Sequence, residues 1–206
     1  MRVWIRRGAL LVWPIALILY LFARPILAGL FPPMFGLQRI APSVWTDTTD
    51  PQIHQRLVTM VAASHARVDR LFGEVSSAAR VLICTSDACS ARLGAQGPRG
   101  IAYGTFVIKL APRGVDAIIV THELTHIARR RTVLGPLRYP TLWREEGIAE
   151  WVAKGPAPST CTVTKELPQG YSDRHMWRND LDLYAQSHCA ISTLIRAQGA
   201  DQVLLN

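Results

Sequence analysis

The sequence has no internal repeat and no low-complexity tract, and its first 39 residues contain no aspartate or glutamate. The lack of repeats excludes a solenoid or another repeat array. The lack of acidic residues explains most of the charge, because five arginines in residues 1–39 supply +5 of the net +8, and the rest of the chain has 18 basic and 15 acidic side chains. That remainder has no strong basic stripe, so the sequence does not indicate a nucleic-acid-binding protein.

Charge is also absent from a run of fifteen residues, Gly8 to Phe22. A helix needs roughly 20 apolar residues to span the hydrocarbon core, and the stretch that continues to Phe31 is long enough if Arg24 reaches the interface. A signal peptide is the alternative, since its apolar region is about 7–15 residues long, but no small-x-small cleavage site follows. We expect residues 1–31 to be an uncleaved, single-pass anchor in the lipid bilayer. The arginines before the run favour a cytoplasmic N-terminus and a periplasmic or extracellular domain.

The chain has few cysteines, four in 206 residues. Four cysteines allow three disulfide connectivities, and disulfides persist in the oxidising compartments outside the membrane. We expect Cys84 to pair with Cys89 across a short loop, and Cys161 to pair with Cys189. The first pair could instead bind a metal or stay reduced in the cytosol, but the outward topology favours the two disulfides.

One short motif carries most of the chemical information: His122-Glu-Leu-Thr-His126. Positions four apart lie on one face of a helix, so the two imidazoles can bind one zinc ion, with Glu123 beside the open coordination position. A carboxylate there can take a proton from a metal-activated water. Six histidines and six glutamates in random order would give this pattern roughly 0.5% of the time, so chance is a poor explanation.

The residues around this motif predict a helix over 114–131, with Asp116 in its first turn and three arginines, Arg129 to Arg131, forming a solvated C-terminal end. Residues 101–110 before it predict a strand. If that strand lies at a sheet edge, it could pair with an extended peptide substrate. It is equally well explained as an ordinary strand of the core.

A second motif, Trp143-Arg-Glu-Glu-Gly-Ile-Ala-Glu150, follows downstream. Together the two motifs resemble the gluzincin branch of zinc metallopeptidases, which includes thermolysin-like and aminopeptidase-like enzymes. The resemblance covers roughly residues 100 to 200, and it implies that Glu146 is the third ligand of one Zn²⁺ ion. It also implies that Glu150 supports a zinc-bound histidine. Glu145, about 100° away around the helix, is expected to be a solvent or rim residue instead.

Gluzincins also use a tyrosine or histidine to stabilise the oxyanion, and the candidates here are Tyr171, His175 and Tyr184. We favour Tyr184, at the start of the last predicted helix. The metzincin branch is excluded, because it requires glycine and histidine where this sequence has Arg129 and Thr132. The remaining histidines are assigned no role in the site: His54 and His65 are expected on the surface of a helix, and His188 in a structural position.

The expected fold class is α+β: a small zincin-like domain with a short mixed sheet packed on the metal-bearing helices, preceded by a transmembrane helix. We divide the chain into the anchor at 1–31, a Pro-rich linker at 32–49 and a metallopeptidase domain at 50–206. Within the domain, further helices are predicted at 52–72, 143–153 and 181–197, and a strand at 81–83.

These patterns predict a membrane-anchored zinc peptidase that acts on a peptide or protein substrate. Glu123 is expected to serve as the general base, and His122, His126 and Glu146 as the metal ligands. The alternative is a catalytically degenerate metallopeptidase-like module that keeps the metal for stability and binds a partner outside the membrane.

Overall fold

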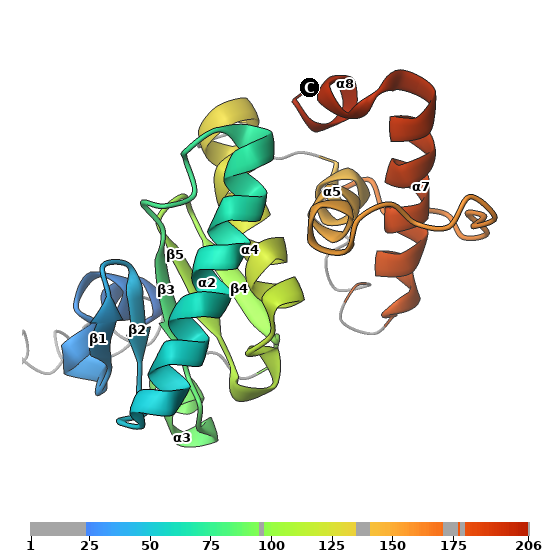
Figure 1. Ribbon diagram of the computed structural model, residues 1–206. Helices are drawn as coiled ribbons and strands as arrows, with labels where there is room; N and C mark the ends of the chain where they lie inside the picture. The colour runs from blue at the N-terminus through green and yellow to red at the C-terminus, as the bar shows by residue number, and fades with distance from the viewer. Residues whose placement is uncertain (1–23, 95–96, 135–140, 171–176, 178–179, 206) are drawn as a thin grey trace, which may run out of the picture.

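A five-stranded mixed sheet forms the centre of the fold and carries helices on both faces (Figure 1). The structure is a computed structural model, and it describes all residues except 1–23, 95–96, 135–140, 171–176, 178–179 and 206. The α+β class predicted from the sequence is therefore confirmed.

The strands follow the order β1-β2-β3-β5-β4 across the sheet. The inner pairs β2/β3 and β3/β5 are parallel, whereas the outer pairs β1/β2 and β5/β4 are antiparallel. The edge strands are therefore β1 and β4. The bounds are β1 Gln38–Ala41, β2 Val44–Thr46, β3 Arg80–Ile83, β4 Gly100–Tyr103 and β5 Val107–Leu110.

Two predictions about these strands were wrong. Residues 101–110 form a hairpin of β4 and β5 rather than one strand, because Gly104 adopts a left-handed conformation (φ 57°) that turns the chain. The segment 32–49 is not a linker, since it contains a 3₁₀ turn, η1 (Pro32–Phe35), and the strands β1 and β2. The parallel pairing of β2 with β3 makes this segment part of the sheet.

The inner strands are mostly apolar and largely buried on both faces, as expected for the parallel centre of a sheet. Val81 and Ile83 of β3 belong to the larger core beneath the helices that carry the candidate site. Leu82, between them, points to the opposite face and packs with the Cys84–Cys89 disulfide and Ala28.

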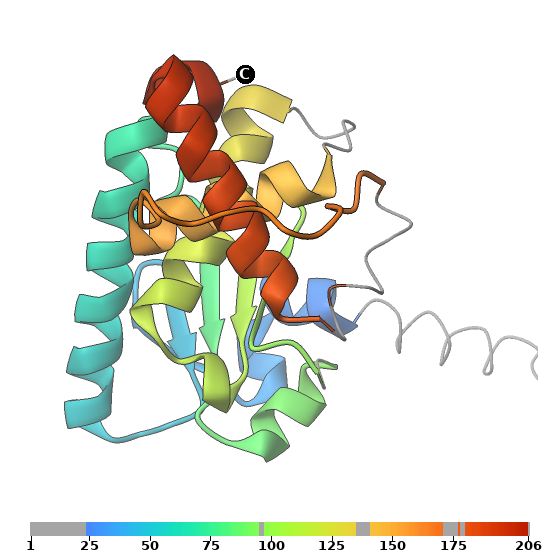
Figure 2. The same cartoon turned by 90° about the vertical axis from the view of Figure 1, so that its right-hand side faces the viewer.

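Four longer helices cover the larger core. They are α2 (Pro51–Phe72), α4 (Ala117–Arg129), α5 (Leu142–Lys154) and α7 (Asp182–Gln198). α2 and α4 lie on the sheet, and α5 and α7 lie beyond α4 (Figures 1 and 2). Shorter elements complete the described chain: α3 (Asp87–Arg92), η2 (Pro112–Gly114), η3 (Arg130–Leu134) and α8 (Ala200–Leu204).

The predicted helices are confirmed within one to three residues at each end. Two of them start at a capping residue: the carboxylate of Asp50 accepts from the backbone N–H of Gln52 at 2.8 Å before α2, and that of Asp116 accepts from Ile118 at 2.7 Å before α4. Asp116 therefore caps α4 from outside rather than lying in its first turn.

Both predicted disulfides are confirmed. Cys84 and Cys89 join the end of β3 to α3, with an S–S distance of 2.01 Å. Cys161 and Cys189 join the segment after α5 to α7. The second bridge closes a loop of 28 residues and so restricts the unfolded chain.

The predicted anchor falls mostly outside the described residues, which begin at Arg24. Residues 24–30 are helical, and no helix within the described part of the chain has the length and apolar character needed to cross a bilayer.

Candidate metal centre

Three side chains from two helices converge on one point. Nε2 of His122 lies 3.2 Å from Nε2 of His126, and Oε2 of Glu146 lies 3.1 Å from the first nitrogen and 3.6 Å from the second. One ligand atom from each side chain lies within 4.8 Å of the others. Among the residues that the structure describes, this is the one such group able to hold a metal ion.

The two motifs meet because α4 packs directly against α5. The histidines are four residues apart on α4 and therefore face α5 together. Gly147, next to Glu146, allows α7 to approach α5 closely: a Cβ atom at this position would lie 2.5 Å from the carbonyl oxygen of Ser187. The glycine of the second motif thus has a packing role, and it fixes how deeply α5 sits between α4 and α7.

Glu150 lies behind His122 as the sequence predicts. Its Oε1 is 3.2 Å from Nδ1 of His122, and its other oxygen pairs with Lys154. A carboxylate on Nδ1 favours the tautomer that has its proton there, so that the Nε2 lone pair faces His126 and Glu146.

The electrostatics of the group are dominated by burial and by these contacts. Burial by itself would lower the pKa of His122, but the carboxylates of Glu146 and Glu150 outweigh it and raise the pKa to about 10. Burial would raise the pKa of Glu146, but the two histidines hold it well below its ordinary range. Burial also opposes ionisation of Glu150, whose pKa the contact with His122 nevertheless lowers to about 2. Without a metal, these contacts therefore favour the charged forms of His122, Glu146 and Glu150.

Glu123 lies beside this network, between α4 and the edge strand β4. Its side chain is buried, and burial raises its pKa although both histidines oppose the shift. The backbone N–H of Ala102 in β4 donates a hydrogen bond to the carboxylate. Gly100 makes room for it, because a Cβ atom there would lie 3.0 Å from Oε1 of Glu123. A raised pKa makes the carboxylate a stronger base, which suits a group that accepts a proton.

Of the three candidates for oxyanion stabilisation, Tyr184 is the one within the described residues. Its ring centroid lies 6.1 Å from that of His122, and the ring packs edge-on against Trp177 at 4.7 Å. Tyr171 and His175, the other two candidates, lie outside the described residues. The structure therefore places Tyr184 beside the group.

Two predictions about charged residues near the site were wrong. Arg129 is not a solvated helix end, since it is 1% exposed, and Glu145 is not a rim residue, since it is 5% exposed. The two form a buried ion pair, with Nη2 of Arg129 2.7 Å from Oε1 of Glu145. Arg129 also donates to the carbonyl oxygen of Leu204 in α8. The sequence has no signal that separates Arg129 from the two arginines after it.

The remaining histidines do not join the group. His54 and His65 are half-buried rather than on the surface, and their rings contact the Thr48 carbonyl oxygen at 2.7 Å and the Ser76 hydroxyl at 2.6 Å. His188 contacts the carbonyl oxygen of Gly155 at 2.7 Å, which agrees with its structural assignment.

This donor set fits a divalent metal ion. Two imidazole nitrogens and one carboxylate oxygen match the preferences of borderline metals. Glu150 directs the lone pair of His122 toward the other two ligands, and three ligands leave a coordination position open. The buried His122–His126–Glu146 group could therefore bind a metal ion.

Comparisons with protein-family models, with curated proteins and with solved structures find no match for this chain. Its function must be argued from the site itself.

Proposed function

We propose that this protein is a zinc-dependent peptidase of the gluzincin type, anchored in the membrane by its N-terminal segment and active outside it. The single observation that carries the proposal is the position of Glu123: a buried carboxylate with a raised pKa, beside a group of three metal-binding side chains. A structural zinc site has four protein ligands and needs no general base. Three ligands with a neighbouring base are typical of catalytic zinc sites.

When bound, zinc polarises the scissile carbonyl and acidifies the attacking water. The chain's own residues perform the proton transfers. Glu123 accepts one proton from the water as its oxygen bonds to the carbonyl carbon, and it then gives this proton to the nitrogen of the peptide bond that breaks. The second proton of the water leaves with the acyl product, so the products are one carboxylic acid and one amine, which become a carboxylate and an ammonium group when that proton is transferred; Glu123 returns to its starting state.

Two further groups assist the reaction. The hydrogen bond from the N–H of Ala102 holds its carboxylate in place. The hydroxyl of Tyr184, whose ring lies 6.1 Å from that of His122, can donate a hydrogen bond to the developing oxyanion.

The proposal is tested with the full chain in detergent or vesicles and a mixed peptide library, with chelator and with zinc restored. We expect chelator-sensitive cleavage, and we expect Glu123→Gln to lose at least about 10²-fold in turnover while keeping its zinc. Glu74→Gln, which changes an exposed glutamate far from the motifs in sequence, is the matched control and should keep full activity.

Full activity of Glu123→Gln would reject the mechanism. Retention of zinc by His126→Ala, measured by elemental analysis, would reject the metal site. If the wild-type chain binds zinc and peptides but cleaves none of them, the binding module is the better description.

A further inference from the structure

Large apolar side chains gather on the surface just after the uncharged N-terminal run. Of the eight large hydrophobic side chains that are exposed in the described part of the chain, four lie within nine residues. We call them the 26–34 patch: Ile26 (45% exposed), Leu30 (48%), Phe31 (54%) and Met34 (81%). Scattered exposed leucines are ordinary, but a contiguous apolar group is typical of an interaction surface.

The patch belongs to a segment that is fixed to the domain rather than hinged to it. Ala28 is fully buried, and a Cβ atom at Gly29 would lie 3.0 Å from Val107 of β5. Arg80 of β3 donates to the carbonyl oxygens of Gly29 at 2.6 Å and Leu30 at 3.0 Å. The inner face of residues 24–30 is therefore packed on the sheet.

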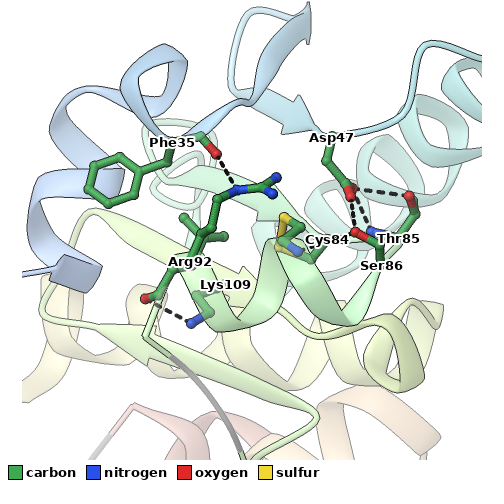
Figure 3. The surroundings of a disulfide bond; sticks show 9 residues. Phe35, Asp47, Cys84, Thr85, Ser86, Arg92 and Lys109 are labelled. Carbon is green, nitrogen blue, oxygen red and sulfur yellow. Dashed lines mark hydrogen bonds between the residues drawn. A yellow bond between two sulfur atoms is a disulfide. The ribbon is translucent and has the colours of Figure 1, made fainter.

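The 3₁₀ turn η1 is fixed in the same way. Phe35 and Leu37 are buried in the core that surrounds the Cys84–Cys89 disulfide. Nε of Arg92 in α3 donates to the carbonyl oxygen of Phe35 at 3.3 Å (Figure 3). Met34, between these contacts, is left to point outward.

The sequence on both sides of the patch carries charge of one sign. The first acidic residue of the chain is Asp47, so the patch lies in a segment with arginines and no carboxylates. Arg39, at the start of the edge strand β1, is exposed. Apolar side chains beside cationic ones are suited to the boundary between acyl chains and anionic lipid headgroups.

We propose that the 26–34 patch lies in the interfacial layer of the bilayer and holds the domain against the membrane in one orientation. The proposal rests on the membrane anchor of the proposed function, and it adds that the anchor does not end in a flexible tether. Continuity in sequence favours lipid over a protein partner, because the uncharged run Gly8 to Phe22 ends two residues before the described helix that carries the patch.

The test uses the full chain in vesicles that contain anionic lipid, with an environment-sensitive fluorophore on a single new cysteine. Met34→Cys places the fluorophore in the patch, and Leu181→Cys, at a residue 78% exposed on the far helical layer, is the matched control. The four natural cysteines are paired in disulfides and do not react. We expect blue-shifted emission and quenching by spin-labelled lipid at position 34, and quenching by aqueous iodide at position 181.

Equal iodide quenching at both positions, in chains that float with the vesicles, would overturn the inference and leave the anchor intact. A blue shift at position 34 without lipid quenching would also overturn it, since a protein would then cover the patch. Chains that do not float would overturn the anchor together with this inference. Peptidase activity is measured separately, so its absence would count against the hydrolase alone.

Discussion

Glu145 and Glu146 are consecutive residues of α5, yet their carboxylates lie in different sites. Oε2 of Glu146 is 3.1 Å from Nε2 of His122, whereas Oε1 of Glu145 is 2.7 Å from Nη2 of Arg129. Consecutive helical residues point about 100° apart, so one turn of α5 serves both the metal-binding group and a buried ion pair with the last residue of α4. Both contacts hold α5 against α4.

The two glutamates should therefore respond differently to the same substitution. Glu146→Gln removes a ligand and should lose bound metal. Glu145→Gln should retain metal but lower the free energy of unfolding by about 3 kcal/mol, because Arg129 stays buried without its counter-charge. Elemental analysis and denaturant unfolding of the two variants make the comparison. Loss of metal from Glu145→Gln alone would show that the ligand was assigned to the wrong neighbour.

Removing the support behind His122 should weaken the metal without abolishing its binding. Glu150→Gln leaves Nδ1 of His122 without a carboxylate, and changes of this kind typically cost about 10–100-fold in metal affinity. Lys154→Gln removes the half-exposed partner of Glu150 but leaves the carboxylate on Nδ1 of His122, so it should change the affinity less. Competition with a chromophoric chelator gives both affinities. Equal losses in the two variants would contradict the supporting role of Glu150.

Tyr184→Phe should act on turnover alone. Removing one oxyanion donor typically costs about 10²–10³-fold in kcat, and the retained ring keeps the edge-on packing against Trp177. KM and bound metal should stay at the wild-type values. Steady-state kinetics check this. An unchanged kcat would mean that a residue other than Tyr184 stabilises the oxyanion.

Lys109 lies on the face of the sheet away from the metal centre. It should make the free energy of unfolding depend on pH. It is 1% exposed, its Nζ donates to the carbonyl oxygen of Leu93 at 3.0 Å (Figure 3), and burial lowers its pKa to about 8. Its unfolded pKa is about 10.4, so between pH 8 and 10.4 the unfolded chain binds more protons and stability rises with pH. The full rise is about 3 kcal/mol, at 1.36 kcal/mol per pKa unit.

Lys109→Met lacks this group, so the difference in unfolding free energy between wild type and variant isolates it. We expect that difference to change in favour of the wild type as the pH rises from 8 to 10.4, and to be constant below pH 8, where the lysine is charged in both states. A difference that stays constant across the whole range would show that Lys109 has an ordinary pKa.

Features that depend on local periodicity can be predicted from the sequence. The spacing of His122 and His126 places both rings on one helical face whatever surrounds the helix. The helix boundaries follow from caps such as Asp50 and Asp116, which act on the backbone N–H groups beside them. The Cys84–Cys89 pair, separated by five positions, is local in the same sense.

Features that depend on contacts between distant parts of the chain cannot be predicted in this way. Arg129 is buried because α5 and α8 cover the end of α4. The residues next to it in the sequence do not predict this burial. β1 and β2 become strands because β3, some 35 residues later, offers a parallel partner. Gly147 lets α7 approach α5 closely, and this contact is not visible in the sequence around the second motif. Local periodicity determines which side chains share a face of a helix or strand. Long-range packing determines which other residues that face contacts.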